Sequence, residues 1–102
     1  MDSVSRLAQR VLDDVDRLES TGDAWTAQIG VYCDDLSVLD LVRTHGDDPD
    51  FYVLPVLLDD RACFRVCWGH YGSHDGAEQA RDLPAAFRGE KPLPRRISTV
   101  TE

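Results

Sequence analysis

The stretch WTAQIGVY, which runs from Trp25 to Tyr32, decides the fold. Apolar and polar side chains alternate along it, as they do in a strand that has one face in the core. The alternation predicts that one face of this strand carries Ala27, Ile29 and Val31. The other face then carries Thr26, Gln28, Gly30 and Tyr32.

The sequence that follows predicts a short helix and a hairpin. Residues 34–45 have the pattern of an amphipathic helix, and Phe51–Leu58 has the composition of a second strand. Pro55 removes one ladder donor, which favours a sheet edge or a bulge at this strand. Asp59-Asp60 separates it from a third strand over residues 62–68, so we expect a hairpin.

The C-terminal third predicts one more helix and one more strand. Ser73 or Asp75 can cap a helix that continues to about Leu83, where Pro84 limits it. Residues 95–100 then predict a final edge strand.

A helix is predicted before the first strand, over residues 2–19. Its apolar residues recur at steps of three and four: Val4, Leu7, Ala8, Val11, Val15 and Leu18. Asp2 or Ser3 can cap its start, and Gly22 can close its end. The other face reads as solvated charge, with Arg10, Asp13, Asp14, Asp16 and Arg17. The apolar stripe must be covered by its own domain, by a second copy or by a missing upstream segment.

The order of elements predicts an α+β fold of the βαββαβ type, as in RNP-like domains, preceded by an N-terminal helix. We expect a four-stranded antiparallel sheet with both internal helices on one face and the first strand inside the sheet. The other face of the sheet is then open. Residues 1–22 form the N-terminal helix in this interpretation, and residues 23–102 form the domain.

Length and charge exclude several classes of protein. The chain has 102 residues, room for one compact domain, and 19 acidic against 11 basic residues give a net charge of −8. This charge repels phosphate backbones, so we expect no nucleic-acid partner. No apolar run approaches the ~20 residues of a membrane span, and the N-terminus lacks the order of a signal peptide.

The predicted strands and helices carry the motifs of a known family. The first strand has Trp25, Gln28, Gly30 and Tyr32 in the pattern aromatic-x-x-Gln-x-Gly-x-aromatic. The later half has Arg65-Val66, Gly69-His70-Tyr71, Ala77, residues 83–87 and Arg95-Arg96-Ile97 after prolines. Over residues 25–100 the chain thus resembles SPOR domains, small bacterial modules that bind peptidoglycan, and in particular the subgroup from cell-division proteins.

The resemblance implies a module that binds peptidoglycan glycan strands stripped of their stem peptides on its open sheet face. It implies a binding role for Gln28, and it implies neither catalysis nor a cofactor. The alternative is a protein-interaction or dimerisation module in which the N-terminal helix engages a partner or a second copy. Cys63, at a position where cell-division members often have an aromatic residue, favours this alternative. The location is periplasmic if the chain is an excised domain, and cytoplasmic if it is complete.

The candidate binding residues follow from antiparallel pairing of the first and third strands. Placing Gln28 opposite Cys67 also places Gly30 opposite Arg65 and Tyr32 opposite Cys63, all on the open face. Tyr52 adds aromatic surface, so the ligand-binding set is Gln28, Gly30, Tyr32, Tyr52, Cys63, Arg65 and Cys67. The alternative interpretation is that Arg65 offsets the acidic charge and that the tyrosines are ordinary strand residues.

The cysteines and histidines suggest a metal site that strand geometry opposes. Cys63, Cys67, His70 and His74 have zinc-like spacing, but four steps of ~3.3 Å separate Cys63 from Cys67 within one strand. Alternation places Cys33 and Cys63 on opposite faces. We therefore predict three reduced cysteines and no bound metal. A catalytic pair of Cys67 and His70 lacks a third orienting group, so we predict no enzyme activity.

Overall fold

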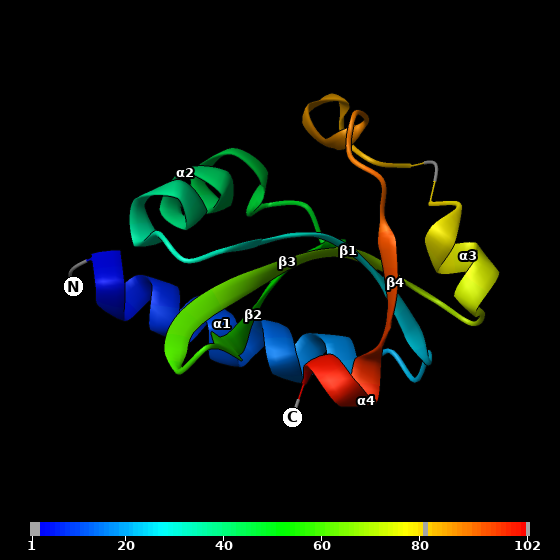
Figure 1. Cartoon of the computed structure of the whole chain (residues 1–102), viewed down its shortest axis with the longest axis horizontal. Helices are drawn as coiled ribbons and strands as arrows, with labels where there is room; N and C mark the ends of the chain where they lie inside the picture. Colours follow the sequence, from blue (N-terminus) through cyan, green and yellow to red (C-terminus); the bar gives the residue numbers. More distant parts are fainter. Residues whose placement is uncertain (1–2, 81, 102) are drawn as a thin grey trace.

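The computed structural model describes residues 3–80 and 82–101. Its elements follow in the order α1 (Ser3–Glu19), β1 (Trp25–Tyr32), α2 (Asp35–His45), β2 (Phe51–Leu58), β3 (Arg61–Tyr71), α3 (His74–Glu78), the 3₁₀ helix η1 (Ala85–Phe87), β4 (Leu93–Arg96) and α4 (Ile97–Val100). The strands form one four-stranded antiparallel sheet, with helices packed around it (Figure 1). The predicted α+β fold is confirmed.

The sheet has the strand order β2-β3-β1-β4. The first strand of the sequence therefore lies inside the sheet, as predicted. β2 and β3 form the predicted hairpin, in which Leu58 pairs with Arg61 across Asp59 and Asp60. Both aspartates have a positive φ, 49° and 65°, which Asp tolerates better than most residues do. Pro55 lies in β2, which is an edge strand, where a missing ladder donor is tolerated.

A bulge interrupts the pairing of β1 with β3. Gln28 pairs with Cys67 and Gly30 pairs with Val66, so Ile29 is an extra residue on β1. An extra residue reverses the face that every later side chain takes. The strict alternation predicted along this strand is therefore wrong after Ile29.

The position of Tyr32 shows this reversal. Tyr32 pairs with Phe64, and both pack against the core that contains Ile29. The sequence prediction placed Tyr32 on the opposite face, together with Gln28. It failed because a period of two residues holds only along an unbroken strand.

The sheet has a hydrophobic core on each face. Neighbouring residues such as Val53 and Leu54 point to opposite faces and belong to different clusters. The core of the first face consists of Leu7, Val11, Ile29, Val38, Phe51, Val53, Val66, Trp68, Leu83 and Phe87. The core of the second face consists of Leu18, Tyr52, Leu54, Cys67, Ile97 and Val100.

Both internal helices lie on the first face, as predicted. α2 contributes Val38 to its core, and Ala80, just after α3, packs against the same cluster. α3 begins at His74 with Ser73 as its cap, whose hydroxyl accepts the N–H of Gly76. It ends at Glu78, earlier than the predicted limit.

The second face is not open over β2 and the middle of β3. Tyr52 and Cys67 are buried there beneath Leu18 of α1 and beneath Ile97 and Val100 of α4. The prediction of an open face is therefore wrong over this region. The error arose because the sequence analysis assigned the residues of α4 to a strand.

The C-terminal segment changes conformation at Arg96, where β4 ends. Residues 97–100 form a helical turn instead of continuing the predicted edge strand. Ile97 and Val100 are three residues apart, which places both on one side of a helix, whereas a strand would point them to opposite faces. Burying both on the second face therefore requires the helical turn.

α1 begins at Ser3 and runs along the outer edge of β2 (Figure 1). Leu7 packs on the first face and Leu18 on the second, so the domain itself covers the apolar stripe. The predicted cap Asp2 lies outside the described residues. Gly22, with a φ of 76°, follows the helix. None of the helices within residues 3–80 and 82–101 has the length and apolar character required to cross a membrane.

Candidate binding face

Cys33 and Cys63 form a disulfide bond, with their Cα atoms 4.2 Å apart. The prediction of three reduced cysteines is therefore wrong. The bulge at Ile29 reverses the alternation along β1, and it brings Cys33 to the face of the sheet that carries Cys63. Cys67 remains free and buried.

The bulge also changes the pairing of the predicted binding residues. Gln28 pairs with Cys67, as predicted. The next two predicted pairs, Gly30 with Arg65 and Tyr32 with Cys63, are each displaced by one residue along β3. The observed pairs are Gly30 with Val66 and Tyr32 with Phe64. Tyr32 therefore lies on the other face from Gln28, and the predicted set does not form one surface.

Burial removes most of the predicted residues from contact with solvent. The exposed fractions are 9% for Gln28, 3% for Tyr52, 2% for Cys63 and 0% for Cys67. The guanidinium of Arg17 lies 4.6 Å from the ring centroid of Tyr52, and burial raises the pKa of Tyr52. Tyr52 and Cys67 lie beneath α1 and α4, so a ligand can reach these two side chains only if one of the helices moves.

A groove remains on the second face, between the β2-β3 hairpin and α4. It encloses about 410 Å³, and its lining includes Val56, Cys63, Thr99 and Val100. Arg65 is the charged residue of this lining. The groove therefore combines apolar side chains with one cation.

Arg65 and Arg95 place two positive charges on the second face. Nε of Arg95 donates to Oε1 of Gln28 at 3.1 Å. Nε and Nη1 of Arg65 are buried, and no acceptor in the described part of the chain reaches them. Loss of solvent, followed in size by the charge of Arg95, lowers the pKa of Arg65. The sequence analysis did not identify Arg95, because it assigned this residue only to an edge strand.

The thiol of Cys67 does not neutralise these charges. Burial raises the pKa of Cys67 to about 12, against the opposing effects of Arg65, Arg95 and a hydrogen bond with Thr26. The thiol is therefore neutral at physiological pH and is a poor nucleophile. His70, considered above as its catalytic partner, instead has Nδ1 2.6 Å from a carboxylate oxygen of Asp23.

The zinc-like spacing of Cys63, Cys67, His70 and His74 does not correspond to a metal-binding cluster. Cys63 is used by the disulfide, and Cys67 is buried among apolar residues of the second face. Within residues 3–80 and 82–101, no three Cys, His, Asp or Glu side chains are grouped so that they could hold a metal ion.

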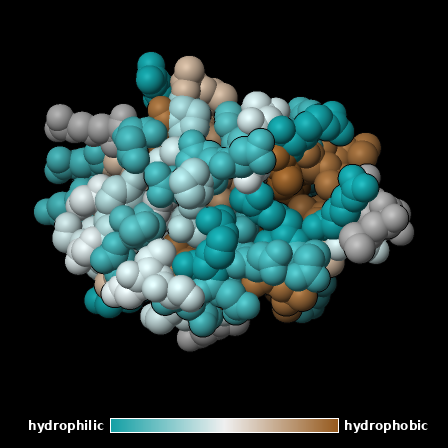
Figure 2. All heavy atoms as spheres, turned by 180° about the vertical axis from the view of Figure 1, so that it is seen from behind, coloured by the Kyte–Doolittle hydropathy of each residue, from teal (hydrophilic) through white to brown (hydrophobic). Residues whose placement is uncertain are grey.

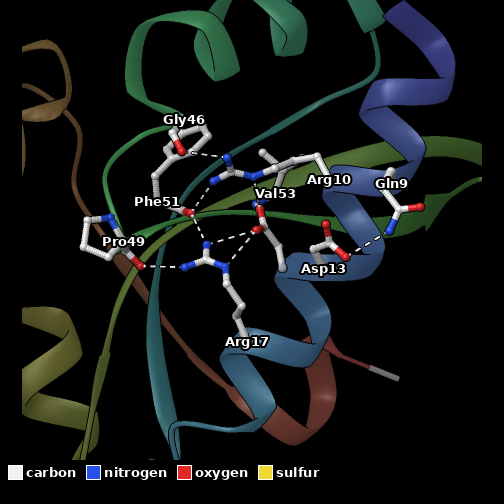
Figure 3. A network of polar contacts seen from close by, with 9 residues as sticks. Gln9, Arg10, Asp13, Arg17, Gly46, Pro49, Phe51 and Val53 are labelled. Carbon is white, nitrogen blue, oxygen red and sulfur yellow. Dashed lines mark hydrogen bonds and ion pairs between the residues drawn. The ribbon is translucent and has the colours of Figure 1, made fainter. Parts of the chain in front are cut away.

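An ion-pair network joins α1 to the free edge of β2 (Figure 3). Asp14 is 1% exposed, and its carboxylate accepts from Nε of Arg10 at 2.8 Å and from Nη2 of Arg17 at 2.9 Å. The backbone N–H of Val53 donates to the same carboxylate at 2.9 Å. Both guanidiniums donate to the carbonyl of Phe51 at 3.0 Å. These side chains occupy hydrogen-bonding positions that a further strand would otherwise take.

This network was not predicted from the sequence, where Arg10, Asp14 and Arg17 were interpreted as a solvated face. The signal was their spacing of four and three residues. This spacing places them in a row that follows the apolar stripe along the helix. The spacing predicts ion pairs along the helix, but their burial depends on the contact with β2, which the sequence does not show.

A second groove lies on the first face, between α1 and the hairpin. It encloses about 360 Å³, and its lining includes Ala8, Leu12, Pro55 and Phe64. Leu12 is 63% exposed. From behind, hydrophobic surface gathers toward the end of the molecule where α1 begins, and most of the remaining surface is hydrophilic (Figure 2).

Comparison with known proteins identifies no relative. No protein-family model matches the chain, and neither a curated protein nor a solved structure gives a significant match. A proposal about function therefore depends on the sequence motifs and on the geometry described above.

Proposed function

We propose that the chain is a non-enzymatic module that binds peptidoglycan glycan strands lacking stem peptides. The observation that supports this proposal best is the groove on the second face, where apolar side chains lie beside Arg65. Sugar rings have apolar faces and polar rims, so a glycan suits a lining of this mixed character. The likeness of the first-strand motif to SPOR domains adds support, although only Gln28 of this motif lies on the second face and Tyr32 lies on the first.

The contacts in this proposal differ from those expected from sequence. Arg65 and the disulfide residue Cys63 line the groove, whereas Gln28 acts indirectly by accepting a hydrogen bond from Arg95. Tyr52 and Cys67 belong to the core of the second face and do not contact the ligand in this proposal. The ligand therefore binds beside α4 and not across the whole width of the second face.

A periplasmic location is part of the proposal. The disulfide between Cys33 and Cys63 supports it, because disulfide bonds persist mainly in oxidising compartments such as the periplasm. Peptidoglycan lies in the same compartment.

Co-sedimentation with purified cell-wall sacculi tests the function. We expect more protein in the pellet after an amidase has removed the stem peptides than before. Val56→Asp places a negative charge in the groove and should abolish the difference. If the wild-type protein stays in the supernatant with both kinds of sacculi, the glycan proposal fails.

Leu12→Asp is the matched control for that variant. It makes the same kind of change on α1, in the groove of the first face, and should leave co-sedimentation with sacculi unchanged. The melting temperature of both variants should stay near that of the wild type, since both positions are partly exposed.

The second candidate function is a protein-interaction or dimerisation module. The exposed Leu12 at the apolar groove of the first face supports it, because exposed apolar patches often mark protein interfaces. Sedimentation velocity over a range of concentrations tests self-association. This candidate predicts a wild-type dimer that Leu12→Asp dissociates and Val56→Asp does not. A monomer at every concentration would count against dimerisation.

A further inference from the structure

Two arginines of the second face lie close together without an acidic partner. Arg65 pairs with Val31 across β3 and β1, and Arg95 pairs with Thr26 across β1 and β4. Arg95 donates to Gln28, and Gln28 pairs with Cys67, which lies two residues from Arg65 on the same face of β3. The two guanidiniums therefore converge on the same part of the sheet.

The hydrogen-bonding capacity of this pair is largely unused. Arg95 donates to the neutral amide of Gln28, and Nε and Nη1 of Arg65 have no acceptor within the described residues. No ion pair of either arginine is found in the part of the chain that the structure describes. Two like charges held together without a counter-charge destabilise the folded protein, and an anion between them would relieve this cost.

The position of Arg65 allows an anion to reach it. Arg65 lines the groove between the hairpin and α4, so rotation of its terminal side-chain bonds can turn the buried nitrogens toward that groove. The apolar lining at Val56 and Val100 then accommodates the part of the ligand that carries the anionic group.

We propose that Arg65 and Arg95 form a binding site for a carboxylate group on a sugar or another small ligand held in the adjacent groove. A planar carboxylate matches the guanidinium fork, which can donate two parallel hydrogen bonds to it. Arg95 supplies the second positive charge, and Gln28 holds it in place.

This inference rests on the proposed function, and it explains which feature of the glycan is recognised. Hydrolysis of the amide that joins a stem peptide to muramic acid adds water across the bond, releasing the peptide amine and leaving a carboxylate on the sugar. The carboxylate is therefore a group that stripped strands have and intact strands lack. Its capture by Arg65 and Arg95 would make the module selective for stripped strands.

Titration of the protein with N-acetylmuramic acid at low salt tests the site, with the neutral N-acetylglucosamine as the matched ligand. Binding is followed by NMR through the Nε–H signals of the arginines. We expect a weak complex, with a Kd on the order of 1 mM, for the acidic sugar. We expect a shift of the Arg65 signal, and no saturable binding of the neutral sugar.

Three variants assign the effect to these residues. Arg65→Gln should weaken binding about tenfold or more, and Arg95→Gln should weaken it severalfold, because each removes a charge-assisted donor. Arg65→Lys keeps the charge without the fork and should restore only part of the affinity. Arg61→Gln removes the same charge from an exposed position at the hairpin turn and should leave affinity unchanged.

The outcomes separate this inference from the proposed function. The protein could bind the acidic sugar, lose this binding in Arg65→Gln, and still not sediment with sacculi. This result would support the carboxylate site and overturn the proposed function. Equal affinity for the two sugars, or an Arg65→Gln variant that binds as the wild type does, overturns the site even if sacculi are bound. Inorganic phosphate that binds through Arg65 when N-acetylmuramic acid does not would overturn the assignment to a carboxylate.

Discussion

Two pairs of arginines lie on different parts of the same sheet, and only one of them has a carboxylate. At the edge of β2, Arg10 and Arg17 share the buried carboxylate of Asp14 and donate to backbone carbonyls. On the second face, Arg65 and Arg95 have no such partner among the described residues. The chain has 19 acidic residues, so a shortage of acid does not explain the difference.

The comparison separates arginines that hold the fold from arginines available to a ligand. The guanidiniums of Arg10 and Arg17 hold α1 to Phe51 of β2 and to the loop before it, so loss of one member leaves polar groups unpaired. Within the described part of the chain, Nε and Nη1 of Arg65 have no acceptor. Its removal therefore affects a ligand more than it affects the fold.

The largest effect is expected from Asp14→Asn. This change removes the charge between two guanidiniums and weakens the acceptor for the N–H of Val53, so we expect a loss of about 3 kcal/mol in the free energy of unfolding. Urea denaturation measures it. Asp13→Asn, at an exposed position one residue earlier, is the control and should change stability by at most ~0.5 kcal/mol. Equal losses in the two variants would show that the network does not stabilise the fold.

A somewhat smaller loss is expected from Cys33→Ser, which opens the disulfide beside the second pair. The bond closes a sequence separation of 30 residues, for which loop entropy gives an upper limit of about 3.7 kcal/mol at 25 °C; because measured losses usually fall below this limit, we expect about 2.5 kcal/mol. Denaturation with and without reductant measures the loss, and reductant should no longer affect the variant. Wild-type protein that is equally stable in both conditions would contradict the stabilising role of the bond.

Replacing one arginine of each pair by methionine tests the comparison directly. Arg10→Met should cost about 2 kcal/mol, because it removes donors to Asp14, Gly46 and Phe51. Arg65→Met should lower the free energy of unfolding by at most ~0.5 kcal/mol, or raise it, because methionine has no buried donor without an acceptor. Equilibrium unfolding of both variants at one pH provides the measurement. A larger loss for Arg65→Met than for Arg10→Met would reverse our interpretation of the two pairs.

At neutral pH the smallest effect is that of Cys67, which changes the stability only in alkaline solution. Its pKa is raised in the folded state to about 12, so its contribution is fully present below the unfolded pKa of ~9 and is lost as pH rises toward 12. Between pH 9 and pH 12, the ionisation of Cys67 should lower the free energy of unfolding of the wild type by up to ~1.4 kcal/mol per pH unit. Tyrosines with raised pKa values add to the fall, so the measured quantity is the difference from Cys67→Ala. If the free energies of unfolding of the wild type and of Cys67→Ala fell in parallel with pH, the contribution of Cys67 would be excluded.

The sequence predicted the fold class because hydrophobic period and turn residues mark each element locally. The first strand, the hairpin at Asp59-Asp60 and the first helix all follow from such signals. The bulge at Ile29 has no local signal of this kind, since any residue can be the extra one where a partner strand shifts its register. This one residue caused two errors, the predicted face of Tyr32 and the predicted reduced state of Cys33.

The candidate site was predicted only in part. Arg65 was recognised from its strand position, but its isolation from acidic groups depends on contacts between distant segments. Arg95 became relevant only through its pairing opposite Thr26. Tyr52 is covered by α4. The helical turn of α4 forms because Ile97 and Val100 are buried together, and this tertiary effect overrides the extended pattern of the sequence.

The side chains of α1 that occupy the edge of β2 also bear on how the protein behaves at high concentration. An uncovered edge strand can recruit a strand from another molecule, and such pairing can continue into polymers. The carbonyl of Phe51 and the N–H of Val53 already have partners within the chain, so this edge does not offer them for growth. A shortened protein that begins after residue 22 would expose both groups and would also lose Leu18 and its α1 neighbours from the two cores, so we expect it to aggregate through β2.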